Sequence, residues 1–196
     1  MSRQPTGRIE TVDGVRRLLI EREFRAPIED VWAAVTEPER LVRWIGTISG
    51  DPATGHVLFA MTAEGEDAPE EDMEIRECTP PRRLAVTSQA GEEHWLLELD
   101  LVEHDGVTTL TFTQPGIDPA IADSVGPGWE YYLDRLVAAE TGGDVAAIDF
   151  DRDYLPGDGR ALPAVVLGHV PAAERDDRGD RGQREQAEEV RRAAGQ

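Results

Sequence analysis

Six segments with strand character follow one another between residues 46 and 114, and only short turns separate them. Turn-forming residues recur at 51–55, 64–72, 79–82 and 90–92, and the dipeptide Asp105-Gly106 is a strong hairpin signal. Parallel neighbouring strands would need connections of about a dozen residues or more. The pattern therefore predicts an antiparallel meander with strands at 46–50, 56–63, 73–78, 83–89, 93–103 and 107–114.

One strand and two short helices are expected before this meander. Residues 16–24 alternate between apolar and polar side chains, as a half-buried strand does. Pro27 suits the first turn of a helix, which we expect to run through Val35, and Pro38 opens a second short helix in the same way. The chain thus passes from one strand through two helices into the meander.

A long amphipathic helix is expected after the meander. Asp118-Pro119 begins a short helical piece, which Gly126-Pro127-Gly128 is expected to interrupt. The longer helix then ends at Gly142-Gly143, and its apolar stripe comprises Trp129, Tyr132, Leu133, Leu136 and Val137. Because this stripe must be buried against the sheet, the predicted fold class is α+β.

Length and composition predict one domain with a tail. A chain of 196 residues suits a single core. We expect a flexible N-terminus over residues 1–14, the domain over 15–143, an extension over 144–170 and a disordered tail over 171–196. The extension carries an apolar stretch at 161–170 that can dock on the domain or on a protein partner.

The charge of the chain excludes one large class of partner. Its 40 acidic residues outnumber 20 basic ones, all of them arginine, so the net charge is -20 and nucleic-acid phosphates would be repelled. The sequence contains no run of about twenty apolar residues, so membrane insertion is not expected. The N-terminal residues are polar and lack the pattern of a secretory signal. With Cys78 as the only cysteine, the cytoplasm is the expected compartment.

Two segments carry a resemblance to a known family. The first is IEREFRAPIEDVWAAVTEPERLVRWI over residues 20–45, with Ala26-Pro27, Val31-Trp32 and Trp44 at the positions concerned. The second is GWEYYLDRLVAAETG over residues 128–142. Together with the strand order between them, they resemble the START-like, or SRPBCC, superfamily, and within it the homologues of the activator of heat-shock protein 90 ATPase.

This resemblance implies a helix-grip architecture, in which a curved sheet holds the last helix and leaves a cavity between them. Members of the superfamily carry lipids, hormones and polyketides, and some catalyse cyclisation or condensation in that cavity. The principal hypothesis is therefore that this chain binds a small, largely apolar molecule, without a cofactor or metal.

The residues expected to contact such a ligand lie on the inner faces of the strands and on the last helix. Each is also typical of ordinary core packing, and only the implied fold assigns them to a cavity wall. Arg22 shares a face with Ile20 and Phe24, where it binds an anionic ligand group, forms a buried ion pair or lies at the edge of a strand. The full set comprises Arg22, Phe59, Met61, Met73, Trp95, Leu97, Phe112, Trp129, Tyr132 and Leu133.

Two alternative functions remain open. The sequence contains no nucleophile elbow, phosphate-binding loop or zinc spacing, so a cyclase-like or condensing enzyme would depend on His94, Tyr132 or Arg22 inside the cavity. An interaction or chaperone-helper protein would instead use residues 149–155 and the tail as a docking segment. The sequence predicts no catalytic residue that decides between these alternatives.

Overall fold

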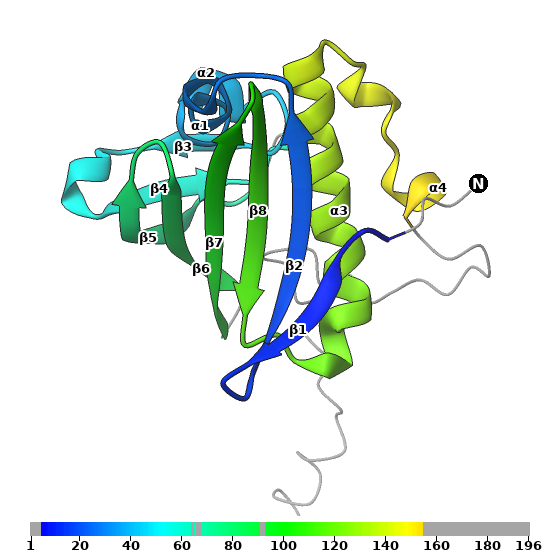
Figure 1. The fold of residues 1–196 in the computed structure, drawn as a ribbon. Coiled ribbons are helices and arrows are strands. Elements are labelled where there is room, and N and C mark those ends of the chain that lie inside the picture. The colour runs from blue at the N-terminus through cyan, green and yellow to red at the C-terminus, as the bar shows by residue number, and fades with distance from the viewer. Residues whose placement is uncertain (1–4, 64, 66–67, 91–92, 155–196) are drawn as a thin grey trace, which may run out of the picture.

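The seven strands predicted from the sequence and one further N-terminal strand form a single antiparallel sheet in the computed structural model, which describes residues 5–63, 65, 68–90 and 93–154 (Figure 1). The strand order is β1-β2-β8-β7-β6-β5-β4-β3, so the predicted meander from β3 to β8 is confirmed. The strands are β1 (Arg8–Val12), β2 (Val15–Phe24), β3 (Thr47–Ser49), β4 (His56–Ala60), β5 (Glu71–Thr79), β6 (Arg83–Ala90), β7 (Glu93–His104) and β8 (Val107–Pro115).

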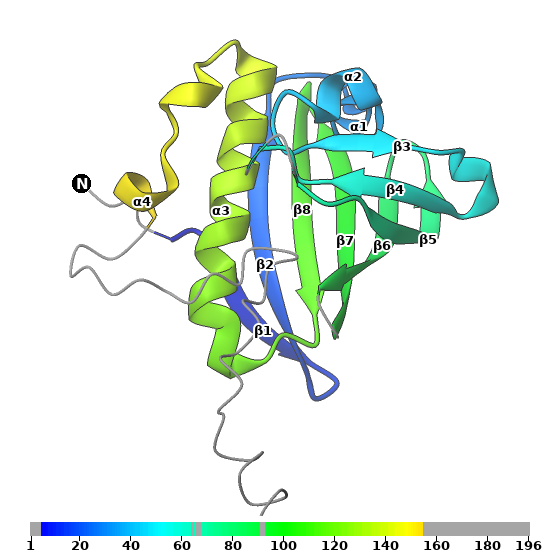
Figure 2. The same cartoon turned by 180° about the vertical axis from the view of Figure 1, so that it is seen from behind.

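Helix α3 (Pro119–Thr141) lies along the concave face of the curved sheet, as Figure 2 shows from behind. The shorter helices α1 (Ile28–Thr36) and α2 (Pro38–Leu41) follow β2 and lie together at one end of the sheet. This arrangement is the expected helix-grip fold. The other helical segments are η1 (Pro52–Thr54), η2 (Val145–Ala147) and α4 (Phe150–Asp153).

The predicted break at residues 126–128 is wrong, because α3 continues through Pro127. A proline inside a helix removes one backbone hydrogen bond and normally kinks or ends the helix. Here Val125 and Trp129, on either side of the proline, are both buried in the core. Their packing against the sheet outweighs the local propensity, as tertiary contacts often do.

The N-terminal segment differs from the flexible start expected over residues 1–14. β1 pairs with β2 through a tight turn in which Asp13 and Gly14 both have positive φ angles, 52° and 80°. Just before β1, the backbone N–H groups of Thr6 and Gly7 each donate to Glu130 Oε1 at 2.6 Å. Most residues of β1 are exposed, so its sequence lacks the alternation of apolar and polar residues from which a strand is predicted.

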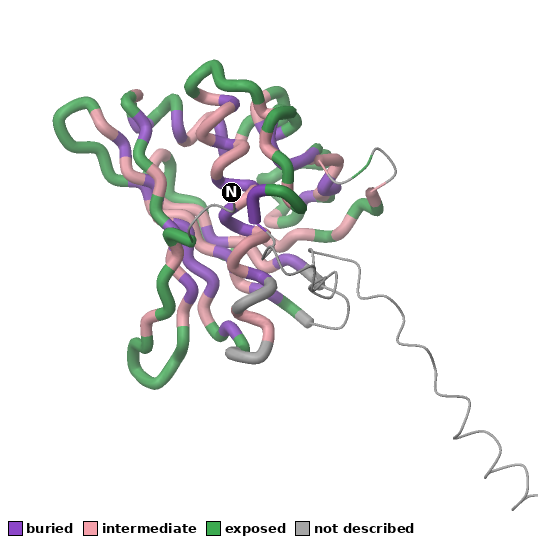
Figure 3. The backbone as a smooth tube through the Cα atoms, turned by 90° about the vertical axis from the view of Figure 1, so that its right-hand side faces the viewer, coloured by how far each residue is buried: buried purple, intermediate pink, exposed green. Residues whose placement is uncertain are grey.

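The hydrophobic core lies between the sheet, α1 and α3, where Figure 3 shows the buried segments. The most deeply buried large side chains come from both layers, and they include Ile20, Phe24, Leu101, Leu110, Tyr132 and Leu136. The predicted stripe of α3 therefore faces the sheet. No helix in the described ranges is long and apolar enough to cross a membrane.

The start of the predicted extension packs back on α3. Tyr154 is buried, and its hydroxyl donates to Asp134 Oδ2 at 2.6 Å. The Phe150 and Tyr154 rings stack on each other, and both meet the Tyr131 ring edge-on. The rest of the extension and the tail lie outside the described residues.

Candidate ligand-binding cavity

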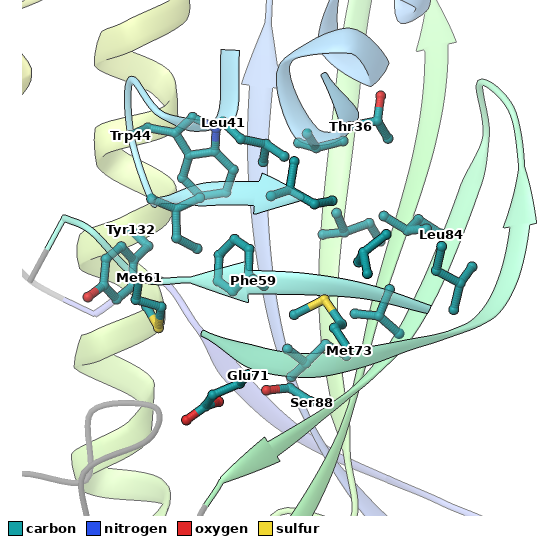
Figure 4. A pocket seen from close by; sticks show the side chains of 18 of the residues that line it. Thr36, Leu41, Trp44, Phe59, Met61, Glu71, Met73, Leu84, Ser88 and Tyr132 are labelled. Carbon is teal, nitrogen blue, oxygen red and sulfur yellow. The ribbon is translucent and has the colours of Figure 1, made fainter. Parts of the chain in front are cut away.

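A cavity of about 560 Å³ lies between the concave face of the sheet and the helices. Figure 4 shows side chains from β4 to β6, from the α2 region and from α3 around it. Small-molecule sites are concave, mostly apolar and of this order of volume. The cavity therefore has the size and position of a ligand site.

Strand register explains the continuous apolar wall on the sheet side. Ile75 on β5 lies opposite Val86 on β6, which in turn lies opposite Leu97 on β7. Leu99 on β7 lies opposite Phe112 on β8 in the same way. Because alternate residues of a strand share a face, these side chains form rows that run across the sheet and line the cavity.

Eight of the ten residues predicted to contact a ligand line this cavity. The structure brings them together from four strands or their ends and from one helix. The aromatic members pack closely, with the ring centroids of Phe112 and Trp129 4.4 Å apart. The eight residues are Phe59, Met61, Met73, Leu97, Phe112, Trp129, Tyr132 and Leu133.

Arg22 and Trp95 lie outside the lining. The Arg22 guanidinium points toward α3, where its Nε–H donates to Asp134 Oδ1 at 2.9 Å and its Nη2 pairs with Glu130. Arg22 therefore forms the ion pair that was one of its expected roles, because α3 places the Glu130 and Asp134 carboxylates beside its guanidinium. Trp95 is buried in the hydrophobic core instead.

Two of the three indole N–H groups at the cavity wall, those of Trp44 and Trp129, have protein partners. Trp44 Nε1–H donates to the Ala34 carbonyl at 3.0 Å, and Trp129 Nε1–H donates to Gln114 Oε1 at 2.8 Å. Both bonds satisfy buried donors, which would otherwise be destabilising. These indoles therefore present apolar surface to a ligand rather than hydrogen-bond donors.

Glu71 supplies the one charged side chain among the described lining residues. Desolvation by burial raises the pKa of its carboxyl above the ordinary value. Glu71 was not predicted from the sequence, because residues 64–72 resemble a turn and the strand was expected to begin at Met73. Its spacing from Met73 and Ile75 was the available signal, since residues two apart on a strand share a face.

The enzyme hypothesis keeps only one of its three named residues in the cavity. His94 is exposed on β7, and Arg22 is held in its ion pairs, whereas Tyr132 lines the cavity. Within the described ranges, no group of three or more His, Cys, Asp or Glu residues is placed to hold a metal ion. The lining thus offers hydrophobic surface with few polar groups.

Comparisons with known proteins agree with this geometry. The profile of the family described as "Activator of Hsp90 ATPase homolog 1-like protein" matches residues 25–140. The matched region begins just after β2 and ends near the C-terminus of α3, so it includes both walls of the cavity. No curated protein matches the chain.

Two solved structures share the fold with moderate sequence identity. The crystal structure of CalU16 from Micromonospora echinospora is 29% identical, with a TM-score of 0.56, over 70% of this chain and 85% of CalU16. DynU16, a protein of the dynemicin biosynthetic locus, is 26% identical, with a TM-score of 0.56, over 66% of this chain and 49% of DynU16.

Proposed function

The chain belongs to the Activator of Hsp90 ATPase homolog 1-like family, and we propose that it acts by binding a small, largely apolar molecule in the cavity between its sheet and α3. The observation that carries this proposal is the cavity of about 560 Å³ with its apolar and aromatic wall. Phe59, Met61 and Met73 contact the ligand from the strand side, and Trp129, Tyr132 and Leu133 contact it from the helix. Leu97 and Phe112 form the floor.

Burial of apolar surface is sufficient to drive such binding. Enclosing about 300 Å² of apolar ligand surface at about 25 cal/mol per Å² yields about 7 kcal/mol, before association costs of at least about 4 kcal/mol. The thioethers of Met61 and Met73 adapt to ligands of different shapes. Binding of this kind needs no sequence motif, in agreement with the absence of catalytic signatures from the chain.

Filling the cavity should abolish binding of an apolar probe. Val86 lines the cavity at the centre of the sheet, and Val86→Trp places an indole in that space. We expect the uncharged fluorophore N-phenyl-1-naphthylamine to bind the full chain saturably, and Val86→Trp to weaken its affinity by about 10-fold or more. A fluorescence titration measures both values.

The matched control is Val102→Trp, because Val102 is 59% exposed on β7 and lies outside the lining. This variant should bind the probe as the original chain does, and circular dichroism should show that both variants are folded. If the two tryptophan variants bound the probe with equal affinity, the probe would not bind in the cavity, and the proposal would be wrong.

A further inference from the structure

Two polar side chains, Glu71 and Ser88, lie at the same end of the mostly apolar cavity. Glu71 is on β5, and Ser88 on β6 lies opposite Met73, the residue two positions after Glu71. Glu71 and Ser88 therefore face the cavity as diagonal neighbours, and Figure 4 shows both side chains on the β5–β6 side of the pocket. They form one polar corner in a hydrophobic wall.

Neither side chain of this polar corner has a protein partner in the described part of the chain. No hydrogen bond or ion pair joins the Glu71 carboxylate or the Ser88 hydroxyl to another described residue, although Ser88 is only 5% exposed. By contrast, the Thr36 hydroxyl in the same lining donates to the Trp32 carbonyl at 2.8 Å. Buried polar groups are normally hydrogen-bonded, so an unpaired corner is available to a ligand.

No side chain that would neutralise the Glu71 carboxylate is among the described residues of the lining. No arginine or histidine is among the described lining residues, so nothing there compensates the desolvation of Glu71. Desolvation raises the pKa of this carboxyl, as expected for a charged form without a partner. A bound cation would offset that desolvation through a charge-assisted hydrogen bond.

We propose that the ligand is an apolar amine whose ammonium group binds the Glu71 carboxylate and donates a second hydrogen bond to the Ser88 hydroxyl. This inference rests on the proposed binding function and adds the chemical class of the ligand. The apolar body fills the space between Phe59, Met73 and Trp129, while the amine lies at the polar corner. The net charge of -20 also attracts cations to the protein, which favours an ammonium ligand over a neutral or anionic one.

A matched pair of probes separates the ammonium group from the apolar body. 1-Naphthylmethylamine is a cation at pH 7, and 1-naphthylmethanol is a neutral molecule of nearly the same shape. Isothermal titration calorimetry with the full chain should show the amine binding about 10-fold tighter than the alcohol. Glu71→Gln should remove that preference by weakening the amine about 10-fold, with the alcohol unchanged within about 2-fold.

Asp72→Asn is the control for long-range electrostatics. Asp72 carries the same charge one residue away but points to the opposite face, where its exposed carboxylate pairs with His56 at 3.0 Å. This variant should keep the preference for the amine, because exposed charges are screened by salt. Equal affinity of amine and alcohol for the original chain, or an amine affinity unaffected by Glu71→Gln, would overturn the assignment of Glu71. If neither compound binds, the proposed function itself fails.

Discussion

Arg22 connects three parts of the molecule through buried charges. Its guanidinium pairs with Glu130 and Asp134 on α3, and its side chain is only 10% exposed. Glu130 in turn accepts hydrogen bonds from the backbone of Thr6 and Gly7 before β1. β2, α3 and the N-terminal segment are therefore held by one cluster, which fixes the helix against the strand beside the cavity.

Removing Arg22 should destabilise the fold strongly. Arg22→Ala leaves the buried Glu130 carboxylate and the partly buried Asp134 carboxylate without their cation, and breaking a buried pair in this way costs about 3–5 kcal/mol. The matched control is Arg8→Ala, because Arg8 pairs with Glu10 and Glu21 at an exposed site and should contribute less than about 1 kcal/mol. Urea denaturation at pH 7 measures both free energies of unfolding. Similar losses in the two variants would show that the cluster has no special role.

The connection between α2 and β3 depends on a close backbone approach at Gly46. A Cβ atom added there would lie 2.0 Å from the Ala60 carbonyl oxygen at the end of β4. The preceding residues, Trp44 and Ile45, both line the cavity. The absence of a side chain at Gly46 thus lets this connection pack on β4 at the wall of the cavity.

The same substitution at two glycines should have opposite effects. Gly46→Ala forces the connection away from β4, and overpacking of this kind costs about 1–3 kcal/mol. Gly128→Ala lies inside α3 with no atom within 4 Å of the added Cβ, so it should stabilise the helix by about 0.5–1 kcal/mol. Thermal unfolding checks both signs. A Gly46→Ala variant as stable as the original chain would refute the steric argument.

Elements with strong local signals were predictable from the sequence. Asp105-Gly106 correctly predicts the β7–β8 hairpin, in which both residues have positive φ angles. Asp13-Gly14 forms an equivalent turn, but exposed residues in β1 gave no alternating pattern to accompany it. The continuation of α3 through Pro127 was not predictable, because it depends on burial of the neighbouring side chains against a sheet distant in sequence.

At the scale of the whole molecule, the cavity could not be predicted from the pattern of residues in the sequence. Residues such as Phe112 and Leu133 have the pattern of any core residue, and whether they enclose a void depends on how α3 lies over the curved sheet. The family resemblance implied a cavity, whereas periodicity alone did not. Glu71 was not predicted because residues 64–72 resemble an acidic turn, and its position diagonal to Ser88 follows only from the pairing of β5 with β6.

Methionine methyl NMR tests the central claim, that the cavity binds a small apolar molecule, most directly. Two of the three methionines of the chain, Met61 and Met73, line the cavity. On titration of N-phenyl-1-naphthylamine into the full chain with ¹³C-labelled methionine methyls, the Met61 and Met73 signals should shift saturably and show contacts to the probe. Probe binding that leaves both cavity signals in place, or no binding at all, would contradict the account.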